Sequence, residues 1–149
     1  VKGGSRSFTP QIVRHRLASF SQQSQRYVRE TDFDYVIPPT IENNPQARLR
    51  FQEMMEAIRK AYGELQDLGI PKQDARFLLP NAVTSEIVIS ANLREWRHIF
   101  SVRCERQAQW EIRTICIQML QELQKVVPTV FSDFVIDEDK MVAFIDRSA

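Results

Sequence analysis

The residue types best suited to chemistry lie close together near the start of the sequence. Arg14-His15-Arg16 is followed, after seven intervening residues, by Ser24-Gln25-Arg26. Arginine stays charged in proteins and presents a planar fork of donors that matches phosphate and carboxylate oxygens. A solvated helix face would also account for such arginines, but the serines and glutamines among them can both donate and accept hydrogen bonds, as recognition of a heterocycle requires. We therefore expect a site for a phosphorylated small molecule that carries a heterocycle.

The basic charge of the chain is concentrated in the same segment. Over 149 residues, 20 lysines and arginines stand against 19 aspartates and glutamates. Residues 1–29 contain six of the basic side chains and no acidic one, which leaves 14 basic and 19 acidic groups for the rest of the chain. A net charge of +1 argues against a broad nucleic-acid-binding or membrane-binding face, so we expect neither partner. The local excess instead indicates a discrete anion site.

Composition predicts a single domain over residues 1–149. Hydrophobic residues make up 43% and charged residues 26% of the chain, which is ordinary for a globular domain with its own core. No apolar run is long enough to span a bilayer and no charged-then-apolar leader is present, which predicts a cytoplasmic location. The sequence begins at Val1 rather than Met, in what resembles a structured element, so we expect a fragment or trimmed chain.

Several common enzyme classes lack their signatures here. Cys104, Cys116, His15 and His98 have no metal-ligand spacing, so we expect no metal site and two reduced, structural cysteines. The chain contains four glycines, none in a phosphate-binding loop, and no elbow glycines surround Ser24. These patterns argue against a zinc hydrolase, a P-loop NTPase and a serine hydrolase.

The first elements are predicted from local signals. A strand is expected within residues 1–8, and Thr9-Pro10 is typical of a helix start with Thr9 as the N-cap. An apolar stripe at Val13, Leu17 and Phe20 extends that helix, and Ser19–Gln25 is expected to form a loop. Helical spacing places Arg14 and Arg16 on roughly opposite sides. Either the helix ends early, or its two sides face different ligands or subunits.

The remaining elements follow from periodicity, caps and turn residues. Asn44 is the predicted N-cap of a long helix, which Gly69 ends and whose apolar face includes Phe51, Met54, Met55, Ile58, Tyr62, Leu65 and Leu68. Further predictions are a short helix between Pro71 and Pro80, a strand at Thr84–Ser90, helices at Leu93–Arg103 and Gln107–Val127, and a hairpin within Val135–Ile145. The mixture predicts a helix-rich α/β (α+β) domain.

A second group of polar residues follows the predicted strand at Thr84–Ser90. Asn92, Arg94 and Arg103 come after the end of that strand, where α/β folds place ligands. Surface ion pairing would account for the other charged side chains nearby, namely Glu95, Arg106, Glu111 and Arg113. Trp96 and Trp110 are expected in the core.

At these residues the sequence closely resembles the flavin-dependent thymidylate synthases. That family is marked by Arg-His-Arg followed seven residues later by Ser-x-Arg, the spacing of Arg14-His15-Arg16 and Ser24-Gln25-Arg26. The resemblance continues, in order, through most of the chain, at Gly4–Phe8, Asp74–Pro80, Asn92–Arg94, Arg103 and Ala108–Arg113.

The resemblance implies reductive methylation of dUMP to dTMP. The family uses 5,10-methylenetetrahydrofolate as the carbon donor and NADPH-reduced FAD as the hydride donor, in a homotetramer with sites between subunits. Its fold has a mixed or antiparallel sheet flanked by helices, and its members have a segment before the position of Val1. An alternative is a non-catalytic, nucleotide-binding, oligomeric remnant of the same family.

The resemblance also implies roles for individual residues. Arg103 would favour ionisation of the pyrimidine and polarise its ring, and Ser24 is a candidate nucleophile by position for which we favour substrate binding. The implied contacts to dUMP are Gln11, Ile12, Val13, Arg14, Gln22, Gln23, Ser24, Gln25, Arg26, Arg76 and Arg103. The implied contacts to FAD are Arg14, His15, Arg16, Gln22, Asn92, Leu93, Arg94 and His98.

Overall fold

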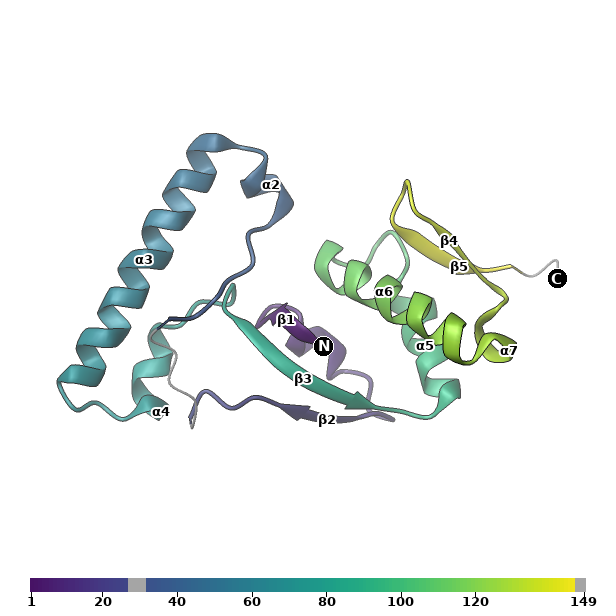
Figure 1. Cartoon of the computed structure of the whole chain (residues 1–149), viewed down its shortest axis with the longest axis horizontal. Helices are drawn as coiled ribbons and strands as arrows, with labels where there is room; N and C mark the ends of the chain where they lie inside the picture. Colours follow the sequence, from purple (N-terminus) through teal and green to yellow (C-terminus); the bar gives the residue numbers. More distant parts are fainter. Residues whose placement is uncertain (27–31, 147–149) are drawn as a thin grey trace. The chain divides into compact units, whose positions relative to one another are not determined.

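The computed structural model describes residues 1–26 and 32–146. The described chain is rich in helices and contains two small sheets, as Figure 1 shows. One sheet has three strands in the order β1-β3-β2, and the other is the antiparallel pair β4-β5. The predicted helix-rich α/β fold class is therefore confirmed.

The chain divides into two compact units. Unit 1 contains Val1, Phe8–Ser21 and Val88–Ala149, and unit 2 contains Lys2–Ser7 and Gln22–Ile87. Strands β2 (Ser19–Gln22) and β3 (Thr84–Ser90) contribute residues to both units. The assignment of residues 1–149 to one domain remains a prediction.

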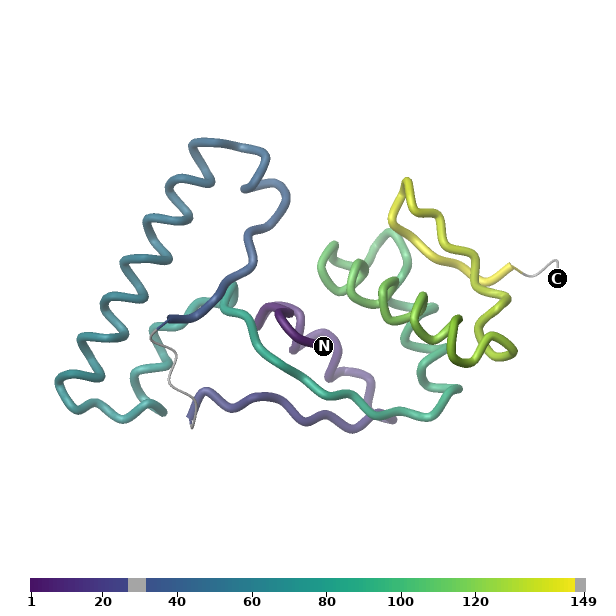
Figure 2. The backbone as a smooth tube through the Cα atoms, viewed as in Figure 1, coloured from purple at the N-terminus to yellow at the C-terminus, as the bar shows by residue number. Residues whose placement is uncertain are grey.

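Unit 2 is built around a long helix whose ends are set by local signals. Helix α3 (Pro45–Asp67) begins after Asn44, whose side-chain oxygen accepts from the backbone N–H groups of Gln46 and Ala47. Gly69 follows the helix with φ 81°, a conformation that favours glycine. The predicted cap and stop are both confirmed. Figure 2 traces the rest of the unit, which includes β1 (Lys2–Ser5), α2 (Pro39–Glu42), α4 (Lys72–Ala75) and the 3₁₀ turn η1 (Arg76–Leu78).

Unit 1 packs two helices against a hairpin. It contains α1 (Thr9–Ile12), α5 (Leu93–Arg103), α6 (Trp110–Val126), α7 (Pro128–Phe131), β4 (Phe134–Asp137) and β5 (Val142–Ile145). Helices α5 and α6 contact each other and both contact β5. Phe100 of α5 is fully buried, with ring centroids 5.6 Å from Trp96, 5.8 Å from Phe131 and 6.3 Å from Phe134. This aromatic cluster supports the helix that carries Arg103.

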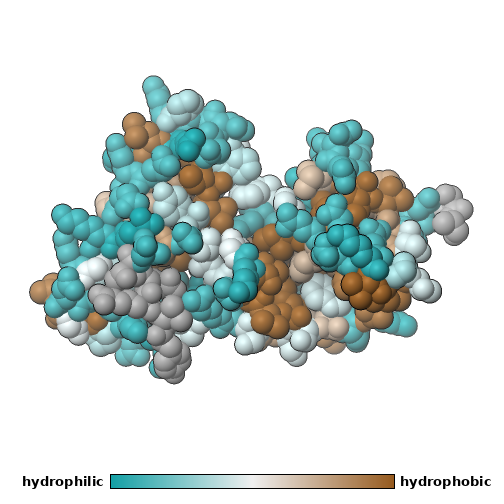
Figure 3. Space-filling model, viewed as in Figure 1, coloured by the Kyte–Doolittle hydropathy of each residue, from teal (hydrophilic) through white to brown (hydrophobic). Residues whose placement is uncertain are grey.

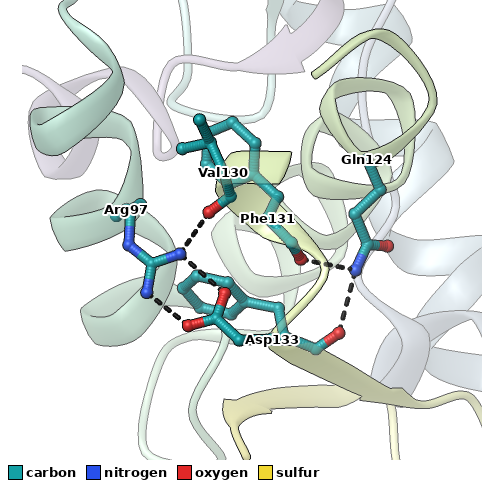
Figure 4. A network of polar contacts seen from close by, with 6 residues as sticks. Arg97, Gln124, Val130, Phe131 and Asp133 are labelled. Carbon is teal, nitrogen blue, oxygen red and sulfur yellow. Dashed lines mark hydrogen bonds and ion pairs between the residues drawn. The ribbon is translucent and has the colours of Figure 1, made fainter. Parts of the chain in front are cut away.

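A polar network holds the segment after α6 against α5 (Figure 4). Arg97 donates from Nη1 and Nη2 to the two carboxylate oxygens of Asp133, at 2.6 and 2.5 Å, and also from Nη1 to the carbonyl of Val130. The bond from Arg97 holds the pKa of the Asp133 carboxyl below its ordinary value. Gln124 Nε2 donates to the carbonyls of Phe131 and Phe134, at 3.0 and 2.8 Å. The network therefore ties both α5, through Arg97, and α6, through Gln124, to the segment Val130–Phe134.

The structure corrects the N-terminal part of the predicted pattern. Phe8, not Thr9, occupies the N-cap position, and α1 ends at Ile12, so the alternative of an early helix end is the right one. Leu17 is 78% exposed, and the stripe through it is not a buried face. Ser19–Gln22 forms strand β2 instead of a loop, because pairing with β3 outweighs the weak local preference of a polar segment.

Several large apolar side chains remain exposed on each unit. In the predicted apolar face of α3, Met55 and Tyr62 are buried, whereas Met54 is 44% and Leu68 77% exposed. Figure 3 shows hydrophobic patches among the hydrophilic side chains on the face in view. None of the helices in residues 1–26 and 32–146 combines the length and apolarity that crossing a membrane requires.

Candidate functional site

His15 is the centre of a buried polar cluster in unit 1. The turn after α1, in which the His15 backbone N–H donates to the Ile12 carbonyl at 3.2 Å, places the imidazole where it is 6% exposed. Three side chains of α5 surround it. Arg103 Nε donates to His15 Nε2 at 2.9 Å, Glu95 Oε1 lies 3.7 Å from Nδ1, and the His98 ring centroid lies 5.7 Å away, edge to face.

These contacts define the protonation of the imidazole. A guanidinium nitrogen can only donate, so His15 Nε2 must accept and carries no proton. In a neutral ring the proton then sits on Nδ1, on the side of the Glu95 carboxylate. Arg103 and Glu95 thus favour the same tautomer from opposite sides of the ring.

Arg103 is held by two bonds that leave part of its guanidinium available. In addition to the bond to His15, Nη2 donates to the backbone carbonyl of Gln11 at 2.9 Å. Arg103 Nη1 makes no hydrogen bond to any residue in the part of the chain that the structure describes. The side chain is half-buried, so its position is fixed while the Nη1 group can meet a ligand. A fixed cation of this kind can stabilise negative charge on a bound molecule.

The surroundings of His15 favour its neutral form. Burial lowers the pKa of the imidazole below 6.5, and the charge of Arg103 and the proximity of His98 lower it further, while Glu95 raises it in part. Near neutral pH the ring therefore remains an acceptor for Arg103.

We expect the free energy of unfolding to fall as the pH is lowered from 6.5 toward the lower pKa that His15 has in the folded chain. In that window the unfolded chain binds a proton at His15 and the folded chain does not, so acid favours unfolding; above pH 6.5 this stabilisation is fully present. Urea unfolding at closely spaced pH values measures the slope. His15→Asn should remove this part of the slope, and equal slopes for the two proteins would contradict the assignment.

Unit 1 contains most of the residues that the resemblance implies for FAD. Asn92 is the N-cap of α5, and its side chain accepts from the Glu95 backbone N–H at 2.8 Å. The guanidiniums of Arg14, Arg16 and Arg94 are exposed, and none has a hydrogen-bond or ion-pair partner among the described residues. Leu93 and His98 are also exposed. Of the residues implied for dUMP in this unit, Val13 is exposed and Ile12 is fully buried.

Unit 2 contains the second part of the predicted site. Gln22 Nε2 donates to Ser85 Oγ at 3.3 Å, and the Gln23 carbonyl accepts from Arg6 Nη2 at 2.9 Å. Gln25 Nε2 is buried and makes no hydrogen bond within the described residues, so a donor is available beside Ser24 and Arg26. Arg76, the first residue of η1, donates from Nε to the carbonyl of Gln73 in α4 at 3.1 Å.

Ser24 is the predicted candidate nucleophile, whereas the two cysteines are predicted to be structural. Ser24 Oγ accepts from the Arg26 backbone N–H at 3.3 Å and makes no other hydrogen bond in the described part of the chain, so its catalytic role remains a prediction. Cys104 and Cys116 are free and buried, and burial raises the pKa of the Cys104 thiol to about 12 and that of Cys116 as well. Neither thiol is a thiolate nucleophile near neutral pH.

Glu95 is the site residue that sequence reasoning missed. Surface ion pairing was expected for it, yet it is 5% exposed and faces His15. Glu111 is likewise buried, and Arg113 donates to the carbonyls of Arg106 and Ala108 instead of pairing across a helix surface. A charged residue three positions after an N-cap is typical of exposed first turns, so the sequence contains no local signal for the burial of Glu95.

Comparison with known proteins covers most of the chain. Residues 1–129 match the family model described as thymidylate synthase complementing protein. The chain is 45% identical over 135 residues to a flavin-dependent thymidylate synthase of Geobacter sulfurreducens, covering 89% of this chain and 58% of that protein. Proteins of the same name from Nitratidesulfovibrio vulgaris and Pyrococcus abyssi are 45% and 43% identical, over 89% and 84% of this chain and 57% and 53% of their own lengths. The chain therefore spans somewhat more than half the length of these curated relatives.

Proposed function

The chain belongs to the thymidylate synthase complementing protein family, and from this membership we propose that it provides the dUMP-binding and catalytic region of a flavin-dependent thymidylate synthase. The proposed reaction converts dUMP to dTMP with 5,10-methylenetetrahydrofolate as the carbon donor and NADPH as the reductant. The observation that carries the proposal is the arrangement of Arg103, whose guanidinium is fixed by His15 and Gln11 and keeps Nη1 available.

Arg103 has the properties that activation of a uracil ring requires. The ring carbon that receives the new group must be electron-rich to form a bond with the transferred carbon. Ionisation of the imide N–H of the same ring raises the electron density at that carbon. A fixed guanidinium stabilises the negative charge that develops on the ring, and its effect is largest where solvent is partly excluded. The neutral His15 adds no second positive charge beside Arg103. It accepts a hydrogen bond from Nε and so holds the guanidinium in place for the ligand.

The donor set of unit 1 fits the pyrophosphate of FAD. Arg14, Arg16 and Arg94 are exposed guanidiniums with no protein partner in the described residues, and such groups bind phosphate oxygens. They would hold FAD together with His15, Gln22, Asn92, Leu93 and His98. When bound, the flavin supplies the hydride chemistry, and the protein supplies binding, orientation and charge.

For dUMP, the proposed charged contacts are the guanidiniums of Arg14, Arg26, Arg76 and Arg103. The amide Nε2 of Gln25, which is buried and has no hydrogen-bond partner among the described residues, would donate to the base or sugar. The other proposed contacts to dUMP are Gln11, Ile12, Val13, Gln22, Gln23 and Ser24. We also propose a homotetramer, as the family resemblance implies, in which association would cover some of the large apolar side chains that each unit exposes. We further propose a cytoplasmic location, where folate and nucleotide substrates meet.

Anaerobic absorbance spectroscopy tests the enzymatic proposal. The purified chain, reconstituted with FAD, should lose flavin absorbance on addition of NADPH and regain it with methylenetetrahydrofolate and dUMP, with dTMP formed in equal amount. A chain that binds dUMP but takes up no flavin would instead support the non-catalytic nucleotide-binding alternative. A chain that binds neither would overturn both.

A further inference from the structure

Glu95 is a buried carboxylate whose surroundings differ from those of an ordinary helix acid. It lies in the first turn of α5, three residues after the N-cap Asn92. In a capping box a glutamate at this position returns its side chain to the backbone N–H of the N-cap residue. No such bond is present among the described residues, and the carboxylate instead faces His15 Nδ1 at 3.7 Å.

The separation of 3.7 Å identifies the kind of contact. It is too long for a direct hydrogen bond but short enough for strong electrostatic attraction in a partly dry site. The negative charge attracts the proton of His15 to Nδ1 and opposes the positive charge of Arg103 on the other side of the ring. Among the groups of the described cluster that act on His15, Glu95 is the acidic one.

We propose that Glu95 is a positioning residue, whose carboxylate holds His15 as the Nδ1–H tautomer so that His15 Nε2 keeps Arg103 oriented with Nη1 toward the substrate. Without the charge of Glu95 the imidazole of His15 is no longer held as one tautomer. The bond from Arg103 Nε to His15 Nε2, one of the two that hold the guanidinium, is then weakened. Arg103 then loses a fixed orientation before the ligand binds, and ordering it again weakens binding. The link to substrate rests on the proposed function, whereas the link between Glu95 and His15 does not.

Nitrogen NMR tests the link between Glu95 and His15 without any ligand. The chain has two histidines, so a long-range ¹H–¹⁵N spectrum of the histidine-labelled full chain contains two imidazoles, and His98→Asn assigns them. His15 should show a protonated Nδ1 and a bare Nε2. Glu95→Gln, which keeps the size and removes the charge, should shift His15 toward a mixture of tautomers. Glu105→Gln makes the same change at an exposed position and should leave the spectrum unaltered.

Calorimetry with dUMP tests the consequence for Arg103. We expect Glu95→Gln to weaken dUMP binding roughly 3- to 10-fold, and Glu105→Gln and the charge-retaining Glu95→Asp to change it less than about 2-fold. A wild-type His15 protonated on Nε2, or an unchanged His15 spectrum in a folded Glu95→Gln chain, would overturn the proposal. If wild-type chain with the expected tautomer binds no dUMP, the proposed function fails and the Glu95–His15 link stands. If Glu95→Gln does not fold, the wild-type spectrum and Glu95→Asp still decide.

Discussion

Replacing Arg103 by alanine is expected to lower the rate of dTMP formation by about 10²- to 10³-fold, the usual effect of removing one fixed donor from developing negative charge. The reason is the Nη1 group of Arg103, which makes no hydrogen bond to a described residue. The guanidinium that carries it is held in place by bonds of 2.9 Å from Nε to His15 and from Nη2 to Gln11. The chain should remain folded, because the substitution removes only two hydrogen bonds, one to the Gln11 carbonyl and one to His15 Nε2. Water can replace Arg103 as the donor to His15. Formation of dTMP, followed by chromatography of the nucleotides with NADPH and folate present, gives the rate.

Two variants separate the position of the charge from its presence. Arg106→Ala removes an exposed guanidinium three residues along the chain, which has no side-chain partner among the described residues, and should leave the rate within about 2-fold. Arg103→Lys keeps the charge but not the planar fork, so it cannot meet His15, Gln11 and a ligand together, and we expect an intermediate rate. Retained dTMP formation in Arg103→Ala, or an equal loss in Arg106→Ala, would contradict the assigned role.

Elements with local determinants could be predicted from the sequence. Asn44 and Gly69 bound α3 through their own side-chain and backbone properties, and the strand at Thr84–Ser90 and the helix at Leu93–Arg103 have the predicted bounds. The C-terminal hairpin was also indicated, because apolar runs flank an acidic turn. In each case the deciding residues lie within a few positions of one another, so propensity and tertiary structure agree.

Features that depend on distant partners could not be predicted in this way. The pattern of Val13, Leu17 and Phe20 has helical spacing, yet the chain turns after Ile12 and places His15 against α5. Strand β2 forms from a polar segment because β3 lies beside it. Residue contacts over such separations cost loop entropy that only the complete fold compensates, and short windows of sequence do not contain them.

The candidate site shows the same division. The resemblance named His15 and Arg103, but it placed them with different ligands, and the bond between residues 88 positions apart emerges only from the structure. Glu95 belonged to no predicted site, since surface ion pairing was expected for it. Because Glu95 is buried beside His15, it forms one electrostatic cluster with His15, which follows α1, and with Arg103 of α5.

Replacing Phe100 by alanine is expected to lower the free energy of unfolding of unit 1 by about 3–5 kcal/mol, because a fully buried aromatic side chain leaves a cavity that its neighbours cannot fill. Phe100 contacts Trp96, Phe131 and Phe134, so its loss removes packing from α5, α7 and β4 together. Both tryptophans of the chain lie in unit 1, and urea unfolding followed by tryptophan fluorescence therefore reports on this unit.

Phe144 provides the matched control for this measurement. It is a phenylalanine of the same unit, on β5, but it is 52% exposed, so Phe144→Ala should cost less than about 1 kcal/mol. Equal losses in the two variants would show that the ring cluster around Phe100 is not the core of unit 1. A selective loss in Phe100→Ala would place the stability of the unit on the same helix that positions Glu95, His98 and Arg103. The packing of α5 would then set both the folding of the unit and the geometry of its polar cluster.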